Sequence, residues 1–199
     1  MSFRIEQKIK IDQNNLINFR QWLNQQKLEY IYPQREISSL YFDNENLDMY
    51  KDSIEGVLPR KKIRIRNYPE NNIKEFFIEK KTSSQEGRFK TTDKIKENKL
   101  AKEIFDLKYG ICKPIVTVSY LREYYKVYNF RLTLDRNLKF KKYSKFSYTK
   151  EIKSNKLSLE IKSNFNYPLD KLEEYFYFER IRFSKYCEGI DMIFNQKIR

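Results

Sequence analysis

The feature that most constrains this chain is an alternation of charged and apolar side chains, clearest in residues 61–68, KKIRIRNY. Lys62, Arg64 and Arg66 fall on one parity, whereas Ile63 and Ile65 fall on the other. Because successive side chains of a β-strand point to opposite faces, a period of two predicts a strand with one buried face and one polar face. The charged side chains on the polar face of this predicted strand are all cationic.

The same separation by parity recurs in most of the other segments that read as strands. It is clean in the segments 3–11, 61–68, 73–81, 130–140 and 156–163, whereas the segment 114–127 is mixed. The β-branched and aromatic content of these segments also favours strands. The pattern therefore predicts a sheet with one apolar face and one densely ionic face, which either lies in bulk water or curls around a lumen.

The remaining segments predict an α+β fold with about eight antiparallel strands, in a single domain over residues 1–199. No repeat, low-complexity tract or Pro/Gly/Ser-rich linker divides the sequence. Asp12 is expected to cap a first helix with an apolar stripe, and Gly56 is expected to end a short helix that passes through Tyr50. Further helices are predicted over 98–110, 168–178 and 184–194.

Composition points to an anionic partner and excludes histidine chemistry. The 199 residues hold 41 Lys and Arg against 27 Asp and Glu and no His, for a formal net charge of +14. Such an excess of positive charge favours binding of anions. Cys112 and Cys187 lack the spacing of a zinc site, so we expect two free thiols in a reducing compartment. No signal peptide or membrane span is evident, which predicts a soluble, cytoplasmic protein.

The ionic face carries more charge than an ordinary solvated face needs. Adjacent cations about 5 Å apart repel by roughly 3 kcal/mol at an effective dielectric constant near 20. An anion held between them would offset this repulsion. Glu6, Glu79 and Glu160 are interleaved with the cations, which disfavours a nucleic-acid backbone and favours a divalent cation. Cations with carboxylates are the combination that phosphoryl transfer uses, while a merely solvated face stays the open alternative.

A set of short motifs, taken in order, resembles a known family. The motifs are EQK (6–8), SSLYFDN (38–44), KIRIRNY (62–68), IEKKT (78–82), SYLREYY (119–125), RLTLD (131–135), LEIK (159–162) and FSKYCEGI (183–190). Together they resemble the VTC (vacuolar transporter chaperone) domain, a branch of the triphosphate tunnel metalloenzymes. Arg4 stands where the CYTH branch of that superfamily has the first Glu of its Glu-x-Glu-x-Lys strand, which favours the VTC branch.

The resemblance implies a fold and a set of activities. The fold is an antiparallel eight-stranded β-barrel, or tunnel, with an ionic lumen and flanking helices. Catalytic VTC domains extend polyphosphate from the γ-phosphate of ATP with Mn²⁺ or Mg²⁺, whereas relatives hydrolyse inorganic or nucleoside triphosphates. A non-catalytic polyphosphate-binding module is the third hypothesis. The sequence shows neither the SPX domain nor the membrane segments of larger VTC proteins, so any export would require a separate membrane-protein partner.

The resemblance also assigns the residues of the site. Glu160, Arg64, Arg66 and Lys81 are the expected catalytic residues, and Glu160 is the expected metal ligand, with Glu6 and Glu79 as helpers. The expected phosphate-binding residues are Lys8, Lys62, Arg64, Arg66, Lys81, Lys90, Arg122, Arg131, Lys162 and Lys185. Arg88 is an alternative to Lys90. Glu160 could instead only balance Arg122 or Lys162, and Lys185 could be an ordinary solvated lysine. Tyr120, Tyr124 and Asp135 receive no role.

Overall fold

The computed structural model describes residues 4–11, 13–71, 74–97, 100, 102–146, 148–164 and 179–194. The chain divides into two compact units. The first unit comprises Met1–Arg35, Tyr120–Leu138 and Ser154–Phe183, and the second comprises Glu36–Ser119, Lys139–Lys153 and Ser184–Arg199. Three long strands contribute residues to both units, namely β2 (Leu28–Asp43), β7 (Gly110–Val127) and β8 (Phe130–Lys142).

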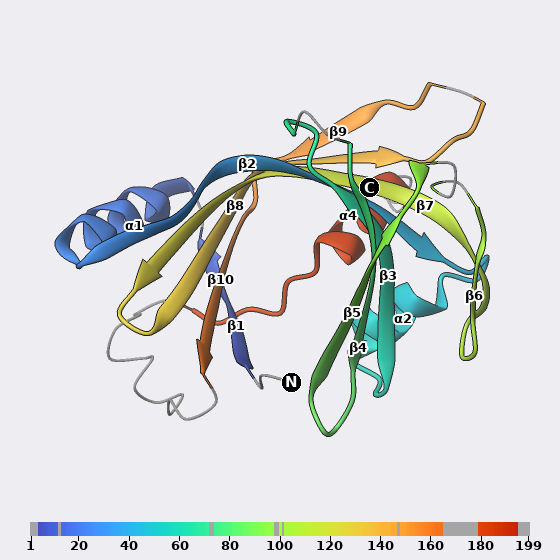
Figure 1. The fold of residues 1–199 in the computed structure, drawn as a ribbon, viewed down its shortest axis with the longest axis horizontal. Coiled ribbons are helices and arrows are strands. Elements are labelled where there is room, and N and C mark those ends of the chain that lie inside the picture. The colour runs from blue at the N-terminus through green and yellow to red at the C-terminus, as the bar shows by residue number, and fades with distance from the viewer. Residues whose placement is uncertain are drawn as a thin grey trace. The chain divides into compact units, whose positions relative to one another are not determined.

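The first unit is built on antiparallel strands and one helix. Strand β1 (Arg4–Ile11) pairs with β10 (Leu157–Asn164), which pairs with β8, and helix α1 (Gln13–Gln25) follows β1 (Figure 1). The apolar parity of these strands, including Ile9, Leu132 and Leu159, is buried against Phe19 and other α1 side chains. The predicted helix after position 12 and the predicted apolar face are therefore confirmed here, while Asp12 itself lies outside the described residues.

The second unit contains the segment with the clearest alternation. The strands β3 (Arg60–Asn67), β4 (Phe76–Ser83) and β5 (Arg88–Ile95) lie side by side as an antiparallel set, and β3 also pairs with β2 (Figure 1). Ile63 and Ile65 are buried, as the alternation predicts. The helices are α2 (Asp48–Glu55), which ends at Gly56, and α4 (Lys185–Phe194). Cys112 and Cys187 are both free, as predicted, and both are buried.

The helix predicted over 98–110 is wrong in its described part. Strand β6 (Ile104–Asp106) pairs with the beginning of β7, and Gly110 takes φ 69° where the chain turns. The Asp106 carboxylate accepts a hydrogen bond from the Lys108 backbone N–H at 3.0 Å. Aspartate side chains that bond nearby backbone groups in this way compete with helix formation, and glycine readily takes a positive φ. These two local preferences outweighed the apolar pattern that suggested a helix.

The architecture confirms a mostly antiparallel sheet with helices, but not a closed barrel. The hydrogen-bonded order is β1-β10-β8-β7-β2-β3-β4-β5, with β6 paired to β7 and β9 (Glu151–Ser154) paired to β8. These eight strands form a linear series with β1 at one end and β5 at the other, and no pairing between β1 and β5 closes it among the described residues. The helix predicted over 168–178 lies outside the described residues, whereas the one over 184–194 is confirmed as α4. None of the helices in the described ranges is long and apolar enough to cross a membrane.

Candidate functional site

Strand register in the second unit places the predicted cations directly beside one another. Lys81 on β4 lies opposite Lys62 on β3 and also opposite Lys90 on β5. Residues that lie opposite in neighbouring strands share a face, with Cβ atoms about 5 Å apart. Lys62, Lys81 and Lys90 therefore form a lysine row across three strands. Arg88, the alternative to Lys90, lies opposite Ser83 at the end of this pairing.

The neighbouring row is centred on Glu79, which lies opposite Arg64. The buried Glu79 carboxylate accepts hydrogen bonds from Arg64 Nε at 2.7 Å and Lys90 Nζ at 2.5 Å. Arg64 Nη2 lies 2.6 Å from Glu79 Oε2, and Arg66 Nη1 lies 3.6 Å from Oε1. We call Glu79, Arg64, Arg66 and Lys90 the glutamate-centred cluster. One carboxylate balances three cations, so this cluster keeps an excess of positive charge.

The charge of Glu79 is secured by its neighbours. Burial raises the pKa of the Glu79 carboxyl, but the charges of Arg64, Arg66 and Lys90 outweigh burial and hold the pKa at about 2. The carboxylate is therefore ionised throughout the physiological range. Three cations contact it, so its helper role in metal binding, which the resemblance implied, stays a prediction. Its contacts fit a role in orienting the arginines.

Arg64 is also held from the β2 side. Its Nη1 donates a hydrogen bond to Tyr41 Oη at 2.8 Å, and the Tyr41 ring stacks on the Tyr186 ring with centroids 5.2 Å apart. Tyr186 on α4 in turn donates a hydrogen bond to Asp43, whose carboxylate also accepts the backbone N–H of Met49 in the first turn of α2. Burial raises the pKa of Asp43 and that of Tyr186. A buried polar chain thus fixes one side of the Arg64 guanidinium.

Lys185, at the start of α4, is only 8% exposed. This burial does not fit the ordinary solvated lysine that was the alternative for this position. The residue before it, Ser184, accepts a hydrogen bond from Lys62 Nζ at 2.8 Å. The start of α4 is therefore linked to the lysine row, while the role of Lys185 in phosphate binding stays a prediction.

In the first unit, two carboxylates contact one ammonium group. Lys162 on β10 lies opposite Glu6 on β1, and Glu160 lies opposite Lys8. Lys162 Nζ is 2.8 Å from Glu6 Oε1 and 3.0 Å from Glu160 Oε1. We call Glu6, Glu160 and Lys162 the lysine-centred cluster. Burial lowers the pKa of Lys162, but Glu160 and Glu6 outweigh burial and raise the pKa above its ordinary value.

The same contacts decide whether the first unit fits a divalent cation. Two carboxylates that reach one ammonium group lie close enough to contact one metal ion in its place. Mg²⁺ usually takes one or two protein carboxylates, with substrate phosphates and water completing its shell. Glu6 and Glu160 fit that donor set. Among the residues that the structure describes, no group of three or more His, Cys, Asp or Glu side chains is arranged to hold a metal.

Three other predicted cations lie in the first unit. Lys8 Nζ donates a hydrogen bond to the Phe183 carbonyl. Arg122 binds Asp135 through two contacts, Nε to Oδ1 at 2.5 Å and Nη2 to Oδ2 at 2.7 Å. Arg131 lies opposite Lys162 and its guanidinium carbon lies 5.6 Å from the centroid of the Tyr124 ring. All three are near the lysine-centred cluster in strand order, but Arg122 is already neutralised by a buried carboxylate.

Sequence reasoning missed three of these partners. Asp135 shares its parity with Arg131, which was a signal for its side-chain position, but it was set aside as a strand-end residue. Tyr124 contacts Arg131 and also Arg35, whose guanidinium carbon lies 4.9 Å from the Tyr124 ring centroid. Arg35 was missed because only the segment ISSLYFDN (37–44) reads as a strand in this part of the sequence, whereas β2 begins at Leu28.

Known structures with a similar fold cover almost the whole chain. An adenylate cyclase candidate from Vibrio parahaemolyticus is 16% identical, with a TM-score of 0.53 and coverage of 96% of this chain and 98% of its own. The PH1819 protein of Pyrococcus horikoshii is 17% identical, with a TM-score of 0.57 and coverages of 96% and 99%. HpAC1 from Hippeastrum, described as an adenylyl cyclase candidate with a dominant triphosphatase activity, is 15% identical, with a TM-score of 0.52 and coverages of 96% and 96%. At these identities the likeness concerns the fold.

The comparison with families is more specific. No curated protein matches the sequence. The VTC domain matches residues 3–194, which is nearly the whole chain and includes both clusters. The resemblance inferred from the ordered motifs is thus confirmed, and the chain belongs to the VTC domain family.

Proposed function

We propose that this chain is a metal-dependent phosphotransferase that extends polyphosphate with the γ-phosphate of ATP. The observation that carries the proposal is the charge of the second unit, where three cations contact Glu79 and the lysine row lies on the same strands. The Cβ atoms of opposed lysines are about 5 Å apart, and ammonium groups held at a similar separation would repel by roughly 3 kcal/mol per pair at an effective dielectric constant near 20. A triphosphate bound to them would offset this repulsion.

The arginines of the glutamate-centred cluster are the proposed donors to phosphate oxygens. A guanidinium group presents two parallel N–H donors, which match two oxygens of one phosphate. Arg64 is held by Glu79 on one side and by Tyr41 on the other, so its orientation is set before a ligand binds. Lys62, Lys81, Lys90 and Lys185 would supply further positive charge. Such fixed donors stabilise the charge of a transferring phosphoryl group without reorganising during the reaction.

Glu160 and Glu6 are the proposed ligands of Mn²⁺ or Mg²⁺, because both reach the Lys162 ammonium group. A divalent cation held there would neutralise phosphate charge and polarise the transferred group. Lys8, Lys162, Arg122 and Arg131 are proposed to contact phosphate oxygens as well. In the transfer, an oxygen of a phosphate or polyphosphate end forms a bond to the γ-phosphorus, and the bond from that phosphorus to the β–γ bridging oxygen breaks.

A triphosphatase is the second candidate function, since water could attack the same phosphorus. The triphosphatase activity described for HpAC1, which shares the fold, favours keeping this candidate. The family match to the VTC domain favours the polymerase. A non-catalytic polyphosphate-binding module is the third candidate. The predicted cytoplasmic location and a membrane-protein partner for export remain predictions.

One incubation separates the three candidates. The protein is mixed with ATP and either Mn²⁺ or Mg²⁺, and the products are read as long polyphosphate on a gel, free phosphate and ADP. Polymer formed together with ADP supports the polymerase, and free phosphate equal to ADP without polymer supports the triphosphatase. Binding of ATP or polyphosphate without nucleotide consumption supports the binding module. The absence of both turnover and binding would overturn all three.

A further inference from the structure

Two arginines of the first unit share one pair of tyrosine rings. The Arg35 guanidinium carbon lies 4.9 Å from the centroid of Tyr124 and 5.4 Å from that of Tyr32. The Arg131 guanidinium carbon lies 5.6 Å and 5.7 Å from the same two centroids. The rings themselves meet edge to face, with centroids 5.4 Å apart. Tyr32 and Tyr124 therefore hold two positive groups next to each other.

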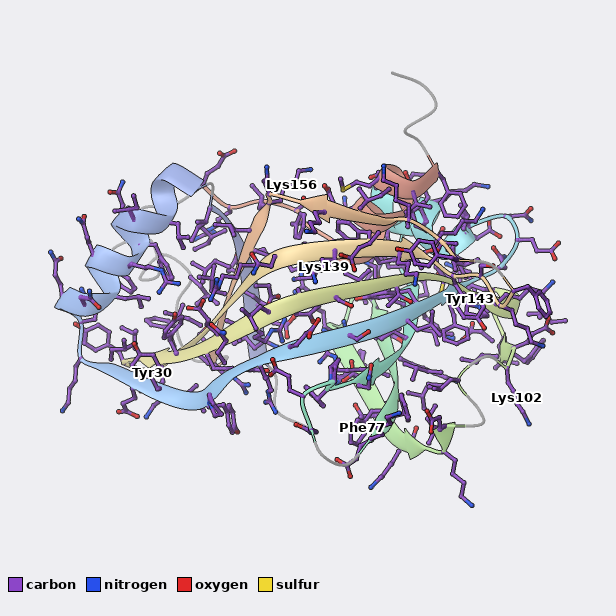
Figure 2. The ribbon with its side chains drawn as sticks, turned by 90° about the horizontal axis from the view of Figure 1, so that it is seen from above. Tyr30, Phe77, Lys102, Lys139, Tyr143 and Lys156 are labelled. Atoms are coloured by element: carbon purple, nitrogen blue, oxygen red, sulfur yellow. The ribbon has the colours of Figure 1, made fainter. Side chains whose placement is uncertain are left out.

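The orientation of Arg35 is fixed by more than ring contact. Its Nε donates a hydrogen bond to Tyr124 Oη at 3.0 Å, and Tyr124 is buried. Figure 2 labels Tyr30 near the start of β2, and Tyr32 and Arg35 follow it on the same strand. When a guanidinium group stacks on a ring and donates a hydrogen bond from Nε, its two terminal nitrogens point away from the acceptor of that bond.

A second observation that indicates an anion site concerns Arg131. Its Nε atom is buried and has no hydrogen-bond partner within the described part of the chain. Buried donors in folded proteins are almost always satisfied, so an unsatisfied one points to a ligand or water in the native environment. Arg131 also lies opposite Lys162, whose ammonium group contacts Glu6 and Glu160. Arg131 thus lies on the strand next to the one that carries Glu160, whereas Arg35 lies on β2, two strands further along.

We propose that Arg35 and Arg131, oriented by Tyr32 and Tyr124, form a phosphate-binding subsite in the first unit. Its ligand class is a phosphate group of an oligophosphate, bound through the terminal nitrogens of both guanidinium groups. The attraction of each cation to the ring faces holds the two like charges together, and the phosphate neutralises them. The proposal rests on the proposed function for the identity of the oligophosphate, but not for the binding of phosphate itself.

The test is calorimetric titration of the full chain with tripolyphosphate, in EDTA to remove metal ions, at several KCl concentrations. Arg35→Gln should weaken binding about tenfold, because a charge-assisted contact is lost, and should make the salt dependence shallower. Arg35→Lys should recover only part of the affinity, since lysine keeps the charge but lacks the planar fork. The control is Lys126→Gln, an exposed first-unit cation paired with Glu29, which should leave the affinity unchanged.

The Tyr124→Phe variant gives a second measurement of tripolyphosphate affinity, which would not change if Arg35 had only a structural role. This variant keeps the ring but removes the acceptor of the Arg35 Nε hydrogen bond, so it should weaken binding less than Arg35→Gln does. Adding it to Arg35→Gln should have little further effect, because both changes act on one guanidinium group. Wild-type affinity in Arg35→Gln and in Arg35→Lys, with unchanged melting curves, would overturn the subsite.

Failure of the proposed function is distinguishable from failure of the subsite. If the wild-type chain binds no tripolyphosphate, the proposed function is overturned, and orthophosphate is titrated instead. Orthophosphate binding that Arg35→Gln weakens would then support the subsite alone. If orthophosphate binds the Arg35→Gln and Arg35→Lys variants as well as the wild type, or binds none of them, the subsite is overturned as well. If Arg35→Gln does not fold, Arg35→Lys and Tyr124→Phe decide by the same criteria.

Discussion

The two charged clusters are built from the same residue types but have opposite compositions. In the glutamate-centred cluster one buried carboxylate contacts three cations, whereas in the lysine-centred cluster one ammonium group contacts two carboxylates. The neighbours lower the pKa of Glu79 to about 2 in the first case and raise the pKa of Lys162 in the second. Cationic excess suits phosphate oxygens, while paired carboxylates suit a divalent cation.

The difference teaches that strand register, and not residue type, decides what a charged strand face can bind. Lys62 lies opposite Lys81, whereas Lys162 lies opposite Glu6, although all four residues belong to alternating strands. A shift of one residue in either pairing would turn the charged side chains to the other face. We therefore expect changes in the glutamate-centred cluster to affect phosphate binding and changes in the lysine-centred cluster to affect metal-dependent turnover.

The largest expected effect is on turnover in the lysine-centred cluster. Glu160→Gln should lower metal-dependent turnover of ATP by about a hundredfold or more, because it removes a proposed metal ligand. Tripolyphosphate affinity measured in EDTA should stay close to that of the wild type, since no phosphate donor is lost. Glu151→Gln, a change at an exposed carboxylate near Lys139, is the matched control. Near-normal turnover in Glu160→Gln would remove the metal role from this cluster.

The next effect concerns phosphate binding in the glutamate-centred cluster. Arg64→Ala should weaken tripolyphosphate binding by about 2–3 kcal/mol, because hydrogen bonds to charged groups in a buried setting are stronger than neutral ones. Titration calorimetry gives the affinity, and a urea melt gives the stability of the same variant. Ile63→Arg should instead destabilise the fold, since Ile63 is fully buried on the opposite face. A harmless Ile63→Arg would show that the strand faces the other way.

The pH dependence of stability isolates Glu79. Its folded-state pKa is about 2, below the ordinary value of 4.5, so its contribution is present above pH 4.5 and is lost as the pH falls toward 2. Acid unfolding of Glu79→Gln should lack this contribution, which amounts to about 3 kcal/mol for a shift of this size. Denaturant melts between pH 2 and pH 6 measure the difference. Parallel stability curves for the two proteins would contradict the ion pairs around Glu79.

The smallest effect tests the support of Arg64 by Tyr41. Tyr41→Phe removes the 2.8 Å hydrogen bond from Arg64 but keeps the ring that stacks on Tyr186. Tripolyphosphate binding should weaken by about 1 kcal/mol, the usual net value of one hydrogen bond. In an Arg64→Ala background the same change should have almost no effect on binding. An equal loss in both backgrounds would mean that Tyr41 does not act through Arg64.

The alternation in the sequence predicted which faces of the strands are buried, but it did not predict which side chains contact each other within the site. The parity of Ile63 and Arg64 set which face of β3 is buried, because the side-chain period of a strand is two. Which charges meet depends on register between strands that are distant in sequence, as for Lys162 with Glu6. The pairing of Arg122 with Asp135 depends on such a register, while the tyrosines beside Arg35 were missed because β2 begins earlier than the sequence indicated.

One local contact and one tertiary contact of Asp106 explain why the helix predicted over 98–110 is wrong. The segment around Asp106 has apolar residues at helical spacing, but its carboxylate accepts bonds from both Lys108 N–H and Lys61 Nζ. The second of these partners is on β3, far away in the sequence. A tertiary contact of this kind overrides weak helix propensity, and no window of residues 98–110 alone contains it.

The most direct test of the central claim is a melting experiment with the metal-free protein. Tripolyphosphate at a hundredfold excess over its dissociation constant should stabilise the fold by about 2.7 kcal/mol. For a chain of this length that corresponds to a rise in Tm of roughly 5–10 °C, well above the effect of KCl at equal ionic strength. The double variant Arg64→Ala, Arg66→Ala should lose most of this rise. A Tm that follows ionic strength alone, with duplex DNA binding as well as tripolyphosphate does, would contradict the claim that these cations form a triphosphate site.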